Sequence, residues 1–249
     1  DVRAPQFAQL VRAFMPDVLD LQEYSLHMHQ QFYPLIRRYG YRIAYEGEEP
    51  WNNTPIFYNP ETVELVDVNY VLYAPSCWSN IGSKSYTSAV FRKKDTGRLF
   101  AVVNTHLWWK SEAAQPGSTY ARAAQVRLMM AEAEVLKNKY GCTIFVTGDM
   151  NAYEDSLPIR QFIEGGYTPC YKAATDATDN GNGHHICGPK DGYSRTSRRR
   201  SPDREKGAID HCFIYNAQEG VAVKVFDCIT ARITVKLTDH YPYLIDAAL

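Results

Sequence analysis

The sequence predicts an α/β protein with many strands and a few helices, organised as one domain over residues 1–249. Three observations lead to this prediction. Short apolar runs of strand length recur along the chain, three stretches have helical character, and no internal repeat, low-complexity linker or change of composition marks a second domain. A chain of 249 residues is also long enough to bury a substantial core.

Seven stretches have the apolar content and length of strands. They are residues 17–22, 87–92, 98–105, 143–147, 208–215, 221–226 and the stretch ending at Leu237. The first is short and apolar on both faces, which is typical of a buried strand.

Helical spacing of apolar residues predicts a first helix around residues 7–14, which ends at Met15 and Pro16. A second helix is predicted at residues 120–139. One face of it carries Val126, Met129, Met130, Ala133 and Leu136. A shorter helix follows Ser156 and ends at the glycine pair after residue 164.

The overall charge and hydropathy of the chain give no indication of a nucleic-acid or membrane partner. The formal net charge is -1, so the chain has no general electrostatic attraction to nucleic acid or membranes, and any anion recognition must be local. No apolar run approaches the roughly 20 residues that a membrane span needs, and no signal peptide is visible. The sequence leaves the compartment open between secreted or periplasmic and cytoplasmic, and we expect a monomer.

The six cysteines show no C-x-x-C pair and no zinc-ligand spacing. Cys142 and Cys212 lie in apolar runs and are interpreted as small core residues. Cys170 and Cys187 flank a loop-like segment and can form a disulfide in an oxidising compartment. Both the free and the bonded state stay open.

Polar side chains of a particular kind end five separate apolar segments. They are Gln22 with Glu23, Asn104 with His106, Asp149 with Asn151, Asp210, and Asp239 with His240. Acids, imidazoles and carboxamides at the ends of several strands indicate one polar site at a common edge of a strand sandwich.

Each of these residues also has an ordinary explanation. Glu23 is by itself more often a solvated carboxylate, the Asp149–Asn151 pair can form a turn through its own backbone, and His106 can be a core imidazole. Asp210 is the hardest to explain in this way, because an acid between Ile209 and an apolar run is buried and needs a partner. The joint occurrence of all five therefore favours a functional site.

The order of these segments resembles the endonuclease/exonuclease/phosphatase superfamily of metal-dependent phosphoesterases, which includes DNase I-like nucleases, inositol polyphosphate 5-phosphatases, sphingomyelinases and deadenylases. The motifs that carry the resemblance are "LQE" at 21–23, "NTHL" at 104–107, "GDMN" at 148–151, "IDHCF" at 209–213 and "TDHYP" at 238–242. Five motifs in order are a far more specific signal than any one of them.

The resemblance implies a four-layer α/β sandwich, in which two mixed, mostly antiparallel sheets pack face to face with helices outside. It also implies Mg²⁺-dependent hydrolysis of a phosphodiester or phosphomonoester by in-line attack of an activated water, with Mn²⁺ as an alternative cation. A nuclease or other phosphodiesterase is favoured. The alternatives are a phosphatase acting on lipid or sugar phosphates and a non-catalytic binding module on the same fold.

Two departures from the family pattern stand out. Thr238 occupies a position where the family usually has Ser, a change that keeps the hydroxyl group. The family normally begins with a core strand ending in an Asn of the site, and we expect that strand to lie upstream of Asp1.

The resemblance implies roles for the first group of site residues. Glu23 is the main candidate metal ligand and Asp239 a second one, since Mg²⁺ prefers hard oxygen ligands. Asp149 would orient and deprotonate the attacking water, and Asn151 would donate hydrogen bonds to the phosphoryl oxygens.

The same resemblance assigns the histidines. His240 would contact the scissile phosphate while Asp210 accepts from its other ring nitrogen. His106 would be a second donor to the phosphate, as an imidazolium, with Asn104 beside it in the substrate site.

Further substrate contacts are proposed after the "NTHL" motif. Tyr120 and Arg122, at the start of the long helix, can reach a substrate phosphate, although Arg122 can equally form a surface ion pair. Trp108 and Trp109 can stack on a base or sugar, or pack beneath the loop. The basic segment 195–200 can cover the substrate or be a solvated loop. The expected partner is a phosphate-ester substrate, with nucleic acid as one candidate.

Overall fold

The computed structural model describes residues 3–45, 51–73, 84–177, 208–229, 234–238 and 240–249. Its centre is a six-stranded sheet with the order β4-β5-β6-β7-β10-β8. These strands are β4 Val63–Leu72, β5 Ser85–Lys93, β6 Leu99–His106, β7 Thr143–Asp149, β10 Asp210–Tyr215 and β8 Thr168–Pro169. Every pair of neighbours is antiparallel except β6 and β7, which are parallel.

Two three-stranded sheets form the layer next to it. One contains β1 Val18–Asp20, β3 Ile56–Tyr58 and β2 Arg42–Ile43, and the other contains β12 Tyr243–Ala248, β11 Ala222–Cys228 and β9 Asp176–Ala177. Phe91 and Phe145 of the central sheet share one buried cluster with Ile56 and Phe226 of the smaller sheets. The sheets therefore pack face to face.

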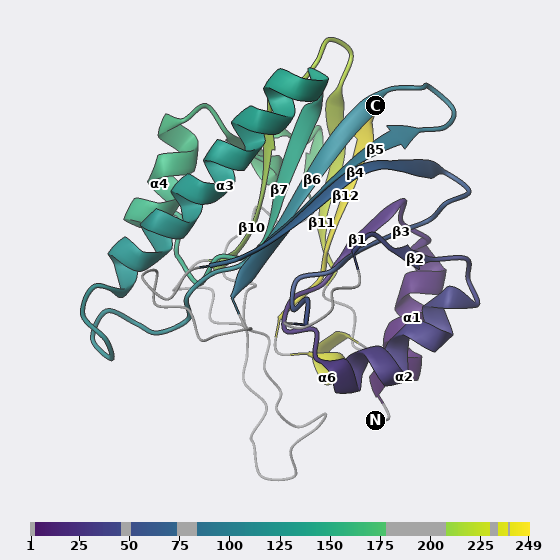
Figure 1. The fold of residues 1–249 in the computed structure, drawn as a ribbon, viewed down its shortest axis with the longest axis horizontal. Coiled ribbons are helices and arrows are strands. Elements are labelled where there is room, and N and C mark those ends of the chain that lie inside the picture. Colours follow the sequence, from purple (N-terminus) through teal and green to yellow (C-terminus); the bar gives the residue numbers. More distant parts are fainter. Residues whose placement is uncertain (1–2, 46–50, 74–83, 178–207, 230–233, 239) are drawn as a thin grey trace.

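Helices cover the outer faces of both layers (Figure 1). The helices are α1 Arg3–Phe14, α2 Leu26–Arg37, α3 Ser118–Tyr140, α4 Leu157–Glu164, α5 Cys170–Ala173 and α6 Thr234–Leu237. Helices α3 and α4 lie on the central sheet, while α1 and α2 lie beside β1, β2 and β3. The predicted four-layer α/β sandwich is thus confirmed.

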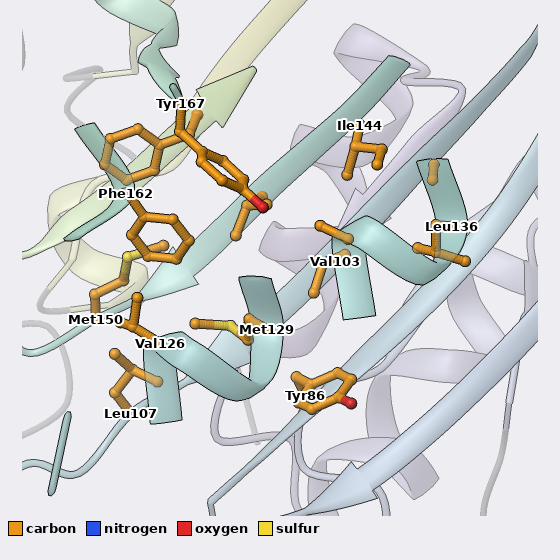
Figure 2. Close-up of a cluster of buried hydrophobic side chains, with 14 of the residues drawn as sticks. Tyr86, Val103, Leu107, Val126, Met129, Leu136, Ile144, Met150, Phe162 and Tyr167 are labelled. Carbon is orange, nitrogen blue, oxygen red and sulfur yellow. The ribbon is translucent and has the colours of Figure 1, made fainter. Parts of the chain in front are cut away.

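Helix α3 buries the face that its periodicity predicted. Figure 2 shows Val126, Met129 and Leu136 of this helix in the same cluster as Val103 and Ile144 of the central sheet. The helix ends at Gly141, whose φ of 59° is a left-handed C-cap conformation. This packing holds the outer face of β6 and β7, two of the strands that carry candidate site residues.

Most predicted elements are present, but one was assigned the wrong type and several were missed, including β4 and α2. The stretch ending at Leu237 was predicted as a strand, but residues 234–237 are helical. Strand β4 was missed because Glu64, Asp67 and Asn69 belong to residue types that are uncommon in strands. Helix α2 was also missed; it begins after Ser25, whose hydroxyl accepts from the Met28 N–H, and it contains Pro34.

Among the described residues, Cys142, Cys170 and Cys212 form no disulfide. Cys142 and Cys212 are buried, as predicted for core residues. Cys170 is also buried, and its Sγ atom lies 3.0 Å from that of Cys212. Cys187 lies outside the described residues, so its pairing with Cys170 stays a prediction. No helix within the described parts of the chain has the length and apolar character needed to cross a membrane.

Asp20 is an acid held between the sheets at the end of β1. Its Oδ2 atom accepts a hydrogen bond of 2.6 Å from the Thr147 hydroxyl, and its Oδ1 atom is buried without a partner among the described residues. Burial raises the pKa of Asp20 to about 7, and the Thr147 hydrogen bond opposes that shift only partly. The ionised carboxylate is therefore destabilising in the folded protein.

We predict that Asp20→Asn stabilises the protein at alkaline pH. Below pH 4 the carboxyl is protonated in both states and costs nothing; from pH 4 to 7 only the unfolded chain ionises, so the penalty grows to about 4 kcal/mol. Urea unfolding should show a gain for Asp20→Asn that is larger at pH 8 than at pH 4. Asp246→Asn, at an exposed strand position, is the control and should show no such gain. A gain independent of pH would contradict this account of Asp20.

Candidate active site

The candidate site begins as a row of paired residues across four neighbouring strands. Ser85 of β5 pairs with His106 of β6, His106 with Asp149 of β7, and Asp149 with Asp210 of β10. Register alone therefore places one imidazole and two carboxylates side by side at one edge of the central sheet. This is the convergence that the strand-end motifs predicted.

Gly148 permits the close approach of β6 and β7 at this edge. Its φ is 136°, and a Cβ atom built there would lie 2.0 Å from the Thr105 carbonyl oxygen. A side chain would have to push β6 and β7 apart. The glycine before Asp149 is thus required by the contact that brings Asp149 next to His106.

Asp149 is a buried acid beside a second acid. It is 8 % exposed, and burial together with the charge of Asp210 raises its pKa to about 7, against the opposing effects of His240 and Lys84. Its Oδ1 atom accepts from the Asn151 N–H at 2.9 Å. A carboxyl group with a pKa near neutrality can exchange a proton at physiological pH.

Asp210 holds His240. The Asp210 Oδ2 atom lies 2.7 Å from Nδ1 of His240. Because an ionised carboxylate only accepts hydrogen bonds, Nδ1 carries the proton, and Nε2 lies on the far side of the ring. The structure therefore places the expected Asp210–His240 pair, and the same three residues Asp149, Asp210 and His240 have ligand atoms within 4.8 Å of one another.

His106 differs from the imidazolium that was expected. It is buried, and burial and the nearby Lys84 and His240 charges lower its pKa well below the usual value. The Lys84 ammonium lies 2.5 Å from His106 Nε2, so Nε2 must accept and the proton sits on Nδ1. His106 Nε2 is 3.4 Å from Asp149 Oδ2, but a neutral ring forms no ion pair. The structure therefore favours a neutral His106 over the imidazolium that the resemblance implied.

Glu23 follows β1 in a strained backbone conformation. Its φ is 54°, a left-handed value that costs a residue with a side chain about 1–2 kcal/mol. The residue is exposed. Strained residues concentrate at functional sites, so this outlier supports the functional interpretation of Glu23 over that of an ordinary strand-end acid.

Asn104 holds the segment before Glu23 through side-chain hydrogen bonds. Its side-chain nitrogen donates to the carbonyls of Leu21 and Pro55, at 2.8 and 3.0 Å, and its oxygen accepts from Gln22 at 2.7 Å. The residue is completely buried. Its amide is thus used to position the chain that leads to Glu23, and it does not face open solvent where a substrate would arrive.

Asn151 lies in a tight turn after β7. It has a φ of 48° and donates from its side chain to the Leu107 carbonyl at 3.2 Å. His211, the neighbour of Asp210, is buried and lies 2.7 Å from the Ala152 carbonyl through Nε2. These bonds tie the turn to both neighbouring strands, so the side chains of Asp149 and Asn151 stay at the sheet edge.

A cavity of about 300 Å³ adjoins this row. Its described lining comprises Glu23, Asn53, Lys84, His106 and Trp109. The lining brings an acid, an amide, an ammonium, an imidazole and an aromatic ring to one place. A small anionic ligand fits such a lining in both size and chemistry.

The remaining predicted substrate contacts take different positions. Arg122 is buried and donates to the carbonyls of Trp108 and Lys110, at 3.1 and 2.7 Å, so it fixes the loop after β6. Tyr120 is 72 % exposed. Trp108 is buried, whereas Trp109 is 54 % exposed and lines the cavity. Asp239 and the basic segment 195–200 lie outside the described residues.

The donors at the site fit a divalent cation. Asp149, Asp210 and His240 form an acid and imidazole group with ligand atoms within 4.8 Å, and Glu23 offers a further carboxylate at the cavity. Carboxylate oxygens suit Mg²⁺ or Mn²⁺, and an imidazole ligand favours Mn²⁺ over Mg²⁺. The resemblance implied Glu23 and Asp239 as metal ligands. It did not imply that role for Asp149 or Asp210.

Sequence reasoning did not find Lys84 or Asn53. Lys84 directly precedes a strand, and nothing in its neighbourhood distinguishes it from a solvated lysine. Asn53 lies in the "NNTPIFYNP" stretch, which contributed to the resemblance without a role for this residue. The strand register supplies the missing signal, because Lys84 adjoins the position that pairs with His106.

The arrangement of layers is the DNase I-like α/β sandwich. The chain belongs to the Endonuclease/Exonuclease/phosphatase family, whose profile matches residues 2–240. No curated protein matches the chain in sequence.

Several solved structures share the fold. A mannosyl-6-phosphatase from Bacteroides thetaiotaomicron has a TM-score of 0.74 at 20% identity, covering 99% of this chain and 91% of that chain. The human Nocturnin catalytic domain with bound sulfate has a TM-score of 0.71 at 20% identity, with 99% and 86% covered. TDP2 from D. rerio with a single-strand DNA product has a TM-score of 0.67 at 15% identity, with 99% and 92% covered.

We predict that Gly148→Ala is strongly destabilising. The new methyl group meets the Thr105 carbonyl, and overpacking of this kind together with the unfavourable φ should cost about 3 kcal/mol or more in urea unfolding. Gly97→Ala is the control: its φ of 72° is also left-handed, but nothing lies within 4 Å of the added atom. It should cost only about 1 kcal/mol. Equal losses in the two variants would contradict the close β6–β7 contact.

Proposed function

We propose that the protein is a metal-dependent phosphoesterase that hydrolyses a phosphate ester by in-line attack of water. The observation that carries the proposal is the convergence of Asp149, Asp210 and His240 from three separate segments, with ligand atoms within 4.8 Å of one another. Membership of the Endonuclease/Exonuclease/phosphatase family supports it. A structural ion pair alone would not need a second buried acid beside the first.

Asp149 is the proposed general base. In the reaction a bond forms between the water oxygen and phosphorus, and the bond between phosphorus and the ester oxygen breaks. The water proton passes to Asp149, whose pKa of about 7 suits a proton acceptor. The leaving oxygen takes a proton from solvent and departs as the alcohol.

His240 and Asn151 are the proposed donors to the phosphoryl oxygens. The Asp210–His240 bond of 2.7 Å fixes the ring and stabilises its protonated form. Asn151 brings an amide to the turn after Asp149. Donors held in place before the reaction stabilise the charge that develops on phosphoryl oxygens without reorganisation.

Glu23 and Asp210 are the described carboxylates that would hold the cation beside Asp149, with Asp239 as a further candidate. When bound, Mg²⁺ or Mn²⁺ would supply positive charge that neutralises the phosphate and acidifies water. Asn104 and Arg122 then act indirectly, because the first supports the Glu23 segment and the second the loop that carries Trp109.

The substrate is a phosphodiester or a phosphomonoester. Proteins with this fold include one named as a mannosyl-6-phosphatase and one bound to a single-strand DNA product, so both bond types are candidates. The second candidate function is a non-catalytic module that binds a phosphate ester. His106 is buried, and the Asn104 side chain donates to backbone carbonyls. Both observations are compatible with either function, the hydrolase or the binding module.

Hydrolysis of model esters tests the proposal. We predict that bis-p-nitrophenyl phosphate or p-nitrophenyl phosphate is cleaved with Mg²⁺ or Mn²⁺, that EDTA stops the reaction, and that Asp149→Asn lowers kcat by about 10²–10⁴-fold. Asp246→Asn, at an exposed position of β12, is the matched control and should keep full activity. Phosphate binding without turnover of either ester would favour the binding module, and full activity of Asp149→Asn would refute the role of this residue.

A further inference from the structure

Lys84 lines the cavity, and the proposed reaction gives it no role. It lies just before β5, 4 % exposed, with its ammonium 2.5 Å from His106 Nε2. Among the described residues, no carboxylate forms an ion pair with Lys84; Asp149 and Glu23 act on it only through their more distant charges. An ammonium buried in this way is costly unless an anion completes its environment.

The charged groups near the cavity set the electrostatic environment of Lys84. Glu23 lines the same cavity and Asp149 adjoins it, so the described residues supply two negative groups near one buried cation. His106 contacts the Lys84 ammonium through Nε2 and offers it no negative charge. A divalent cation held by the carboxylates would leave Lys84 as a second positive charge facing the cavity.

We propose that this cavity receives the terminal phosphate of a phosphomonoester, with Lys84 binding a non-bridging oxygen and thereby selecting monoesters over diesters. This inference rests on the proposed function. A monoester carries a charge of about −1.5 to −2 at neutral pH, as phosphorylated side chains do. A diester carries a single negative charge. The additional charge interacts strongly with an ammonium inside the protein, where the effective dielectric constant is low.

The size and lining of the cavity agree with a small monoester. A volume of about 300 Å³ lies at the lower end of the range for small-molecule sites. Trp109 contributes an aromatic face on which the carbon skeleton of the alcohol can pack. A diester keeps two non-bridging oxygens but only one negative charge, so its pairing with Lys84 is weaker.

Comparison of two esters in Lys84→Met tests the inference. Methionine keeps the length of the side chain and removes its charge, so kcat/KM for p-nitrophenyl phosphate should fall by about 10–100-fold, as expected for a lost charged hydrogen bond. The kcat/KM for bis-p-nitrophenyl phosphate should fall less than about 3-fold. Binding of inorganic phosphate, measured by calorimetry with Mg²⁺ present, should weaken in parallel with the monoester reaction.

Two controls separate this role from a structural one. Lys94→Met makes the same change at an exposed position beyond the opposite end of β5 and should alter neither ester. Because Lys84 has no carboxylate partner among the described residues, Lys84→Met should unfold at the same or a higher temperature than the parent protein.

The outcomes are distinct for the two proposals. Absence of turnover of both esters by the parent protein would count against the proposed function. An active parent protein whose Lys84→Met variant loses both esters equally, loses neither, or keeps its affinity for phosphate would overturn the role of Lys84 and leave the hydrolase intact. If the methionine variant unfolds below the assay temperature, Lys84→Gln is measured by the same ratio of the two esters.

Discussion

The site depends on the pairing register of β6, β7 and β10. That register brings His106, Asp149 and Asp210 to one edge of the central sheet, and the close approach of β6 and β7 leaves no space for a side chain at position 148. A slip of one residue would turn the side chains to the opposite face. The chemistry is therefore fixed by backbone hydrogen bonds and by the packing of α3 on the outer face of these strands, long before any ligand arrives.

The same edge concentrates groups that reduce the stability of the fold. Asp149 is an acid buried beside another acid, Lys84 is a buried ammonium, and Glu23 has a left-handed backbone. Each costs free energy in the protein without ligand, and a cation and an anionic substrate would offset the burial of the Asp149 and Lys84 charges. Asp20, at the end of β1, has a raised pKa without any such compensation from the described residues.

The sequence was sufficient for those parts that depend on order and periodicity. The five motifs led to the DNase I-like sandwich, and the spacing from Val126 to Leu136 identified the buried face of α3. The sequence was insufficient where tertiary contacts determine the protonation state or the orientation of a side chain. The neutral state of His106 results from burial next to Lys84, and the inward-facing amide of Asn104 results from its contacts with Leu21 and Pro55. Strand β4 and the helix at residues 234–237 were missed because their local composition does not indicate their conformation.

Anomalous diffraction from crystals soaked in Mn²⁺ tests the convergence most directly, because it locates the cation without reference to any substrate. The account predicts a peak within coordination distance of carboxylate oxygens from the group Glu23, Asp149 and Asp210, at the edge where β6, β7 and β10 meet. A fully occupied peak elsewhere, with none at this edge, would contradict it.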